Sequence, residues 1–375
     1  MTIGRPSNYL LAAVFSAVAF AQQTPSNATV YATGLEGPRG LRFGPDGHLY
    51  VAEAGTGGTT STTDADCEQT PPPVGPYKGG TSTGRISKIS SSGKVTTVAS
   101  GFPSSSDGLG DNQGVADVVF VDNELYALIS GGGCSHGNPK SPNGIAKVNR
   151  NDGSWKLLAN LSAFLKTHPA KYESVDDFEP DGTPYSVIQV HGTMYLIEPN
   201  RGEIISVSRT GHMSEVLDVS ASQGHIVPTS IAERDGSFFV GNLNLFPIDP
   251  QWARILTISN GDRDDDYDTP PGFRQPRGYR ITASKAGFTT VVGVDFGPDG
   301  LLYVLELSDA AGMGPTPGKG KVVRVKHSGE IEEVVTGLVV PTGMTFGPDG
   351  DLYISNFGAA PAGGQILKVD VPPVW

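Results

Sequence analysis

The sequence predicts an all-β fold, a six-bladed β-propeller with four-stranded blades, on three observations. First, the 375-residue chain contains 50 glycines and 29 prolines, which is typical of short strands joined by tight turns and excludes a helical bundle. Second, one strand–turn–strand segment recurs along the chain, and such repeats indicate blades. Third, residues 29–35 resemble a strand near the other end of the chain.

The recurring segment reads as a β-hairpin. Its three closest copies share a Gly-Pro-Asp-Gly turn at 44–47, 297–300 and 347–350. Pro presets φ at the second turn position, Asp bonds its own backbone, and the final Gly accepts a positive φ. Weaker copies lie at 116–129, 185–198 and 228–242. The chain therefore contains six hairpins.

Each hairpin is followed by a third strand, and most by a fourth, which gives blades over 36–100, 101–160, 161–219, 220–291, 292–338 and 339–371. The last blade lacks a fourth strand, and Thr29–Leu35 matches Glu333–Leu338 in the preceding blade. If residues 29–35 complete the last blade, the ring closes and no sheet edge stays open. We therefore expect one propeller domain over 29–375, preceded by a linker at 22–28.

The first 21 residues are predicted to be a signal peptide for export. Arg5 supplies the positive charge, residues 9–20 are apolar, and Ala19-Phe20-Ala21 fits a cleavage site. An uncleaved anchor is the alternative. We expect a secreted or periplasmic protein with no transmembrane segment in the mature chain. The net charge of −12 and the absence of Lys/Arg runs disfavour nucleic acid as a partner. A monomer that binds a small molecule or a protein is expected.

Long inserts are predicted to share one face of the disc. The short Pro-Asp-Gly turns lie on one face (the tight-turn face), whereas inserts at 55–83, 130–143, 243–252 and 308–319 follow second strands and lie on the other (the insert face). Binding loops on a rigid scaffold favour the insert face as the functional one. Cys67 and Cys134 lie in equivalent inserts of neighbouring blades, which predicts a disulfide. Two free thiols are the alternative.

A ring of polar residues is predicted at the channel mouth. Three residues after the aligned aromatic of each second strand stand Glu53, Ile129, Glu198, Asn242, Glu306 and Asn356. Carboxylate and amide oxygens suit Ca²⁺ or a similar cation, although Ile129 interrupts the ring and no His favours zinc. The alternative is that these side chains bind loop backbone or channel water.

Other motifs carry less information. Asp262, Asp264, Asp266 and Asp268 alternate as in a calcium loop, but Gly and Glu are missing at the required places, so a solvated acidic loop is the alternative. His136 and His225 are expected on the insert face without ligand spacing. The chain has no nucleophile elbow, Walker loop or dinucleotide fingerprint.

The chain resembles the ScyD/ScyE family of exported propellers with NHL/SMP-30-like repeats. The resemblance rests on residues 32–55, 183–186, 227–231, 300–306 and 340–343 and keeps blade order. It implies export and a six-bladed propeller but no reaction. Asn242 stands where relatives tend to carry Glu. Gluconolactonase-like propellers and soluble quinoprotein sugar dehydrogenases are looser relatives.

Three functional hypotheses follow. The first is a non-catalytic scaffold that binds a ligand or protein on the insert face. The second is a metal-dependent hydrolase or lactonase, in which a Ca²⁺-like cation at the ring polarises a carbonyl or activates water, with Glu53, Glu198 or Glu306 as ligand or base. The third is quinone-type redox chemistry, for which no basic, His-bearing pocket is identified. Metal analysis with and without chelator discriminates best.

Overall fold

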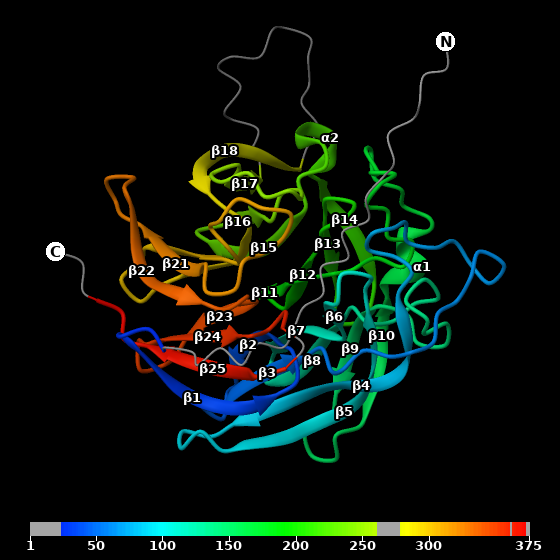
Figure 1. Ribbon diagram of the computed structural model, residues 1–375, viewed down its shortest axis with the longest axis horizontal. Helices are drawn as coiled ribbons and strands as arrows, with labels where there is room; N and C mark the ends of the chain where they lie inside the picture. The colour runs from blue at the N-terminus through cyan, green and yellow to red at the C-terminus, as the bar shows by residue number, and fades with distance from the viewer. Residues whose placement is uncertain (1–23, 261–277, 361, 373–375) are drawn as a thin grey trace, which may run out of the picture.

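The computed structural model describes residues 24–260, 278–360 and 362–372. Within them, 25 strands form six sheets around a central axis, and two short helices lie in the connections between sheets (Figure 1). The predicted six-bladed propeller is therefore confirmed. The expected signal peptide at 1–21 and the acidic loop with Asp262, Asp264, Asp266 and Asp268 lie outside the described residues.

The first three blades follow chain order. The first sheet contains β2 (Pro38–Phe43), β3 (Leu49–Glu53), β4 (Lys78–Ile89), β5 (Val95–Ser106) and the two-residue β6 (Asn112–Gln113). The second contains β7 (Val115–Val121), β8 (Glu124–Ile129), β9 (Gly144–Val148) and β10 (Trp155–Asn160), followed by helix α1 (Leu161–Leu165). The third contains β11 (Val187–Val190), β12 (Thr193–Glu198), β13 (Glu203–Val207) and β14 (Met213–Asp218), followed by helix α2 (Ser220–Gln223).

The last three blades complete the ring. The fourth contains β15 (Pro228–Arg234), β16 (Ser237–Asn242), β17 (Ala253–Asn260) and β18 (Tyr279–Phe288). The fifth contains β19 (Val291–Phe296), β20 (Leu302–Glu306), β21 (Gly320–Val325) and β22 (Ile331–Leu338). The sixth contains β23 (Gly343–Phe346), β24 (Leu352–Asn356), β25 (Gly364–Val369) and β1 (Ala28–Leu35).

The N-terminal strand closes the ring as predicted. β1 pairs antiparallel with β25 from Ala28 opposite Val369 to Leu35 opposite Gly364, and in Figure 1 the blue β1 lies beside the red β25. Tyr31 also packs edge-on against Tyr353 of β24, with ring centroids 5.0 Å apart. The first and last parts of the described chain therefore hold one blade together.

The first strand of each blade lies innermost. These strands contact one another in a closed series, β2–β7–β11–β15–β19–β23 and back to β2. Between each pair of neighbouring blades lies one cluster of buried apolar side chains, for example Tyr126 and Leu128 of the second blade against Leu196 and Ile205 of the third. The core is thus divided into six wedges, and these wedges fix the blades around the channel.

The Gly-Pro-Asp-Gly turns also make a local side-chain contact that the turn chemistry does not require. In each, the Asp carboxylate accepts the hydroxyl of the Tyr four residues on, at 2.9 Å for Tyr50, 2.7 Å for Tyr303 and 2.8 Å for Tyr353. The same carboxylates also accept nearby backbone N–H groups, such as Leu301 N on Asp299 at 3.0 Å. The repeated Asp and the aligned Tyr therefore act as one unit in these turns.

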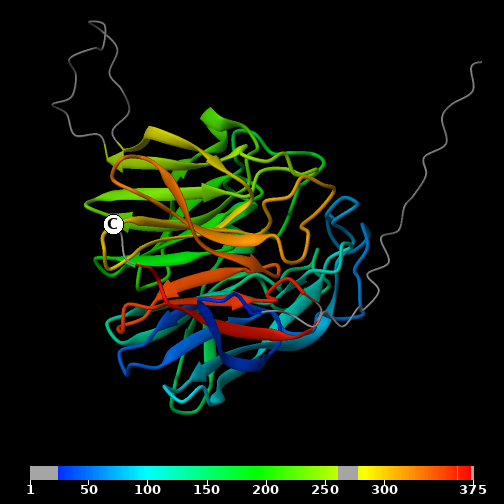
Figure 2. The same cartoon turned by 60° about the vertical axis from the view of Figure 1, so that its left-hand side comes forward.

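The inserts lie on the opposite side of the disc from these turns. Figure 2 shows the blue insert between β3 and β4 and the orange insert between β20 and β21 on the same side. Among the described residues, no helix is long and apolar enough to cross a membrane.

Candidate functional site

The central channel is narrow. A cavity of about 50 Å³ is lined by first-strand residues of all six blades, including Arg42, Asp117 and Ser230. This is space for a few water molecules. Arg42 Nε and Ser230 Oγ are buried and make no hydrogen bond to any described residue. The cavity therefore offers polar atoms to solvent but is too small for an organic ligand.

Two aspartates connect neighbouring blades by hydrogen bonds, and one of them, Asp117, lines this cavity. Asp117 accepts the N–H of Val118 at 2.8 Å and that of Val187, in the next blade, at 2.9 Å. Asp295 accepts Phe296 N at 2.8 Å and the backbone of Phe346, again in the next blade. Burial raises the pKa of Asp117 to about 6, and the charge of Arg42 and the two N–H groups oppose that rise.

The channel mouth on the insert face is charged. Arg39, 6% exposed, donates to Asp111 Oδ1 at 2.6 Å and to the carbonyl of Asn112. Tyr185 lies beside Arg39 and donates its hydroxyl to Thr342 O at 2.9 Å. Burial, and then the neighbouring Asp111 charge, raise the pKa of the half-buried Asp107 to about 7. A half-buried carboxyl with a raised pKa, next to the Arg39–Asp111 pair, makes this region a candidate binding site.

A buried polar cluster supports one side of this mouth. Glu179, 1% exposed, accepts the hydroxyls of Thr70 at 2.7 Å and Tyr77 at 2.9 Å. His136 lies with Nε2 3.4 Å from the same carboxylate and stacks on Tyr77 at 4.1 Å between centroids. Glu179 thereby joins the inserts of the first and second blades to the segment that enters the third.

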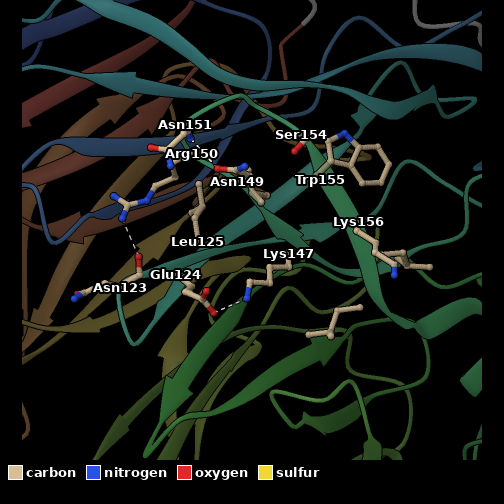
Figure 3. A pocket seen from close by; sticks show the side chains of 13 residues that line it. Asn123, Glu124, Leu125, Lys147, Asn149, Arg150, Asn151, Ser154, Trp155 and Lys156 are labelled. Carbon is tan, nitrogen blue, oxygen red and sulfur yellow. Dashed lines mark hydrogen bonds and ion pairs between the residues drawn. The ribbon is translucent and has the colours of Figure 1, made fainter.

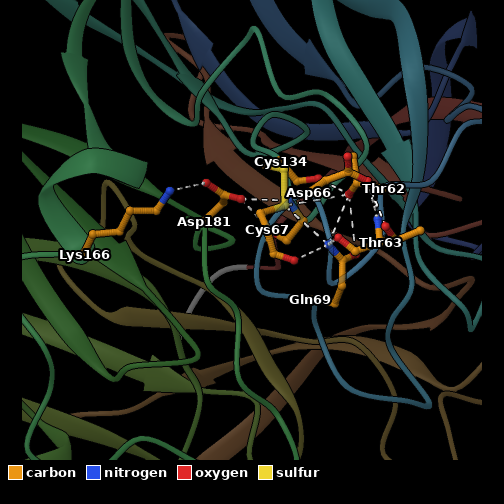
Figure 4. Close-up of a disulfide and its surroundings, with 9 residues drawn as sticks. Thr62, Thr63, Asp66, Cys67, Gln69, Cys134, Lys166 and Asp181 are labelled. Carbon is orange, nitrogen blue, oxygen red and sulfur yellow. Dashed lines mark hydrogen bonds and ion pairs between the residues drawn. A yellow bond between two sulfur atoms is a disulfide. The ribbon is translucent and has the colours of Figure 1, made fainter.

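The predicted disulfide is confirmed and ties the same inserts together. Cys67 and Cys134 are bonded, with their Cα atoms 6.3 Å apart (Figure 4). Next to it, the Asp181 carboxylate accepts the N–H and hydroxyl of Ser135 at 2.8 and 2.9 Å, and Lys166 Nζ lies 3.8 Å away. The disulfide and these hydrogen bonds therefore restrict the movement of the long inserts of the first two blades.

The five Glu and Asn residues of the predicted ring are all buried at the insert-bearing ends of their second strands. Each binds the backbone of the segment that enters its own blade. The partners are Glu36 N for Glu53, Thr183 N for Glu198, Ile226 O for Asn242, the Thr289 backbone for Glu306 and Val339 N for Asn356. This shared contact accounts for the repeat of the polar residue in five blades.

The residue opposite the ring Glu or Asn, on the third strand of the blade, differs between blades. Glu53 is paired with Arg85 at 2.7 Å, and Glu306 lies 3.9 Å from Lys321. In the third blade Glu198 stands opposite Glu203 instead. Glu203 is fully buried, and neither of its carboxylate oxygens bonds a described residue. Burial, and then the Glu198 charge, raise the pKa of Glu203 to about 8.

A metal centre is not assembled by the residues described. No three His, Cys, Asp or Glu side chains among them converge as cation ligands. His225 lies on the insert face and is 2.8 Å from Asp177. Sequence reasoning missed Arg39, Asp107, Glu179 and Glu203. Arg39 and Glu179 acquire their roles only when distant segments meet, whereas Asp107 bonds within its own loop and Glu203 faces Glu198 in the same hairpin. The Asp107–Asp111 loop was the one local signal for the channel mouth.

A second, larger cavity lies on the tight-turn face of the second blade. It measures about 720 Å³ and is lined by the β7–β8 and β9–β10 turns, with Lys147, Arg150 and Trp155 among its residues (Figure 3). Two of its basic side chains have partners: Lys147 lies 2.7 Å from Glu124, and Arg150 donates to Asn123 O at 2.9 Å. Both members of the Lys147–Glu124 pair are exposed, so water screens this pair.

Comparison with known proteins identifies the fold. No family model matches the chain, and no curated protein matches its sequence. Among solved structures, the calcium-binding protein regucalcin of Agrobacterium tumefaciens strain C58 is similar with a TM-score of 0.52 and 14% identity, covering 92% of this chain and 94% of its own. A glucose dehydrogenase is similar with a TM-score of 0.53 and 13% identity, covering 92% and 99%.

An auxiliary nutrient binding protein of Bacteroides thetaiotaomicron is also similar, with a TM-score of 0.52 and 11% identity over 90% of this chain and 69% of its own. A metal-binding protein, an enzyme and a binding protein therefore share this architecture. At such low identity these likenesses show the propeller fold alone.

Proposed function

We propose that the chain is an exported propeller of the ScyD/ScyE type that acts as a non-catalytic binding scaffold through its insert face. One observation carries the proposal. Of the eight large apolar side chains exposed among the described residues, seven lie on insert-face connections, and Val30 of β1 is the exception. The seven are Leu109, Tyr172, Val175, Leu245, Phe246, Trp252 and Met313. Exposed apolar side chains gathered on one face mark an interaction site.

The conformation of the insert-face loops is restrained by covalent and polar contacts. The disulfide, the Glu179 cluster and the Arg39–Asp111 pair hold the inserts around the channel mouth. Such preorganisation lowers the entropy lost on binding. An auxiliary nutrient binding protein shares this fold, which is a precedent for a binding role.

The experiment is a thermal-shift screen of the purified mature chain against sugars, lactones, organic acids and peptides. Every ligand that raises the melting temperature is retested on Asp107→Asn and Trp252→Ala variants, with Lys147→Gln, at the cavity of the opposite face, as the matched control. We expect the shift to fall in the insert-face variants and to persist in the control. Ligands lost only in Lys147→Gln contradict the proposal.

The second candidate is a divalent cation at the channel mouth supporting hydrolase or lactonase chemistry. Its support is that Glu306 Oε2 is buried without a hydrogen bond to any described residue, and that regucalcin, a calcium-binding protein, shares the fold. Elemental analysis and turnover of lactones before and after chelation test it. We favour the scaffold, because each of the five ring side chains already has an oxygen that accepts a backbone N–H group.

A further inference from the structure

Two neighbouring inserts present an apolar strip. Leu245, Phe246 and Trp252, in the connection between β16 and β17, are 48%, 41% and 63% exposed. Met313, in the connection between β20 and β21, is 83% exposed. We call these four residues the apolar strip. Water contacts these apolar side chains in the free protein, and a partner that covers them releases this water, which favours binding.

The strip is exposed but firmly held. Ile248 N donates to Gly312 O at 2.6 Å, which joins the two inserts directly. Leu243 N donates to Val227 O at 2.9 Å, and Gln251 N donates to Thr289 Oγ1 at 2.9 Å, so both ends of the first insert are anchored to the blade. The strip is therefore a preorganised surface, which favours binding.

The types of side chain favour a protein partner. Trp, Phe and Met are enriched at the cores of protein interfaces, and Trp is among the commonest residues of binding hot spots. Phe246 and Trp252 offer flat rings, but half of the strip, Leu245 and Met313, is aliphatic, which suits the apolar side chains of a protein better than a sugar. Met is flexible and adapts its shape to an apolar surface.

The charges around the strip define the partner further. Asp249 lies in the same insert and is exposed. Lys321 is occupied by Glu306, Asp309 and Glu333, at 3.9, 3.3 and 3.3 Å. Beyond the strip, the insert-face connections carry more carboxylates than lysines. The carboxylates include Asp64, Asp66, Glu68, Asp107, Asp111, Glu173, Asp176 and Asp177, of which Asp111, Glu173 and Asp177 are paired with Arg39, Arg201 and His225; the lysines are Lys140, Lys166, Lys171 and Lys319. This excess of carboxylates attracts a basic partner.

We propose that the apolar strip docks a protein segment whose apolar side chains are flanked by Lys and Arg. The inference rests on the proposed function and specifies its partner. The apolar side chains of the segment cover Trp252 and Met313, and its basic residues face Asp249 and the acidic connections around the channel mouth.

The test uses two fluorescent twelve-residue peptides with the same Leu/Phe core, one flanked by lysines and one by glutamates. Fluorescence anisotropy measures their binding to the mature chain at 50 and 300 mM NaCl. We expect the basic peptide to bind more tightly, and salt to weaken it because salt screens surface charges. Trp252→Ala should weaken it about 30-fold, the loss typical of a hot spot. Trp155→Ala, on the opposite face, is the control.

Three outcomes overturn the inference: equal binding of both peptides, no binding of either, or unchanged binding by Trp252→Ala and Met313→Ser. Concentration-dependent self-association that these two variants abolish also overturns it, because the occupant is then a second copy of the chain. If ligands of the thermal-shift screen still depend on Asp107, the proposed function stands while this inference fails.

Discussion

Replacing Glu203 by Gln should change how the stability of the protein depends on pH. Glu203 is fully buried on β13, with Glu198 opposite on β12 and Asp218 opposite on β14. Arg201 and Glu215 also act on it. Burial, then the Glu198 charge, raise its pKa from an ordinary 4.5 to about 8. The folded protein therefore holds a proton there that the unfolded chain releases.

The sign and size of the effect follow from proton linkage. Below pH 4.5 both states carry the proton, so its full stabilisation is present. As the pH rises from 4.5 to about 8, only the folded state keeps the proton, and the free energy of unfolding falls. One pKa unit corresponds to about 1.36 kcal/mol, so the loss amounts to roughly 5 kcal/mol at most. Above about pH 8 this loss of unfolding free energy does not increase further.

Guanidinium unfolding at pH 5, 6, 7, 8 and 9 measures this directly. The difference in unfolding free energy, Glu203→Gln minus wild type, should rise by about 1.4 kcal/mol per pH unit up to pH 8 and then level off. Glu68→Gln, an exposed carboxyl in the insert of the first blade that is not among the groups acting on Glu203, is the control and should follow the wild-type curve. A flat difference curve for Glu203→Gln refutes the reasoning.

Three further predictions concern stability. Cys67→Ser with Cys134→Ser should lower the unfolding free energy by about 4 kcal/mol or less, because the bond closes a loop of 67 residues; a calorimetric melting temperature equal to that of wild type contradicts this. Deleting residues 29–35 should lower the melting temperature sharply, since β25 then has a free edge, and an unchanged melting curve would show that β1 does not hold the ring. EDTA and added Ca²⁺ should each leave the melting temperature unchanged; a shift with either supports the metal-dependent alternative.

The sequence predicted the features that depend on local chemistry and on repetition. The turns at Asp46, Asp299 and Asp349 follow from turn chemistry, and the place of β1 follows from its match to the preceding blade. The disulfide followed from equivalent inserts in neighbouring blades. Glu179 could not be predicted, because its partners Thr70 and Tyr77 lie 109 and 102 residues away and meet it only after the inserts pack.

The polar ring shows why periodicity alone does not identify a site. A position repeated in five blades can be required by five ligand contacts or by five identical backbone contacts, and both produce the same pattern in the sequence. The blades differ instead at the cross-strand position, where Arg85 pairs with Glu53 and Lys321 lies 3.9 Å from Glu306, but Glu203 faces Glu198. Departures from a repeat are therefore more informative than the repeat itself, because the shared fold does not require them. Because the Glu198–Glu203 pair is such a departure, mutagenesis of the ring should begin in the third blade.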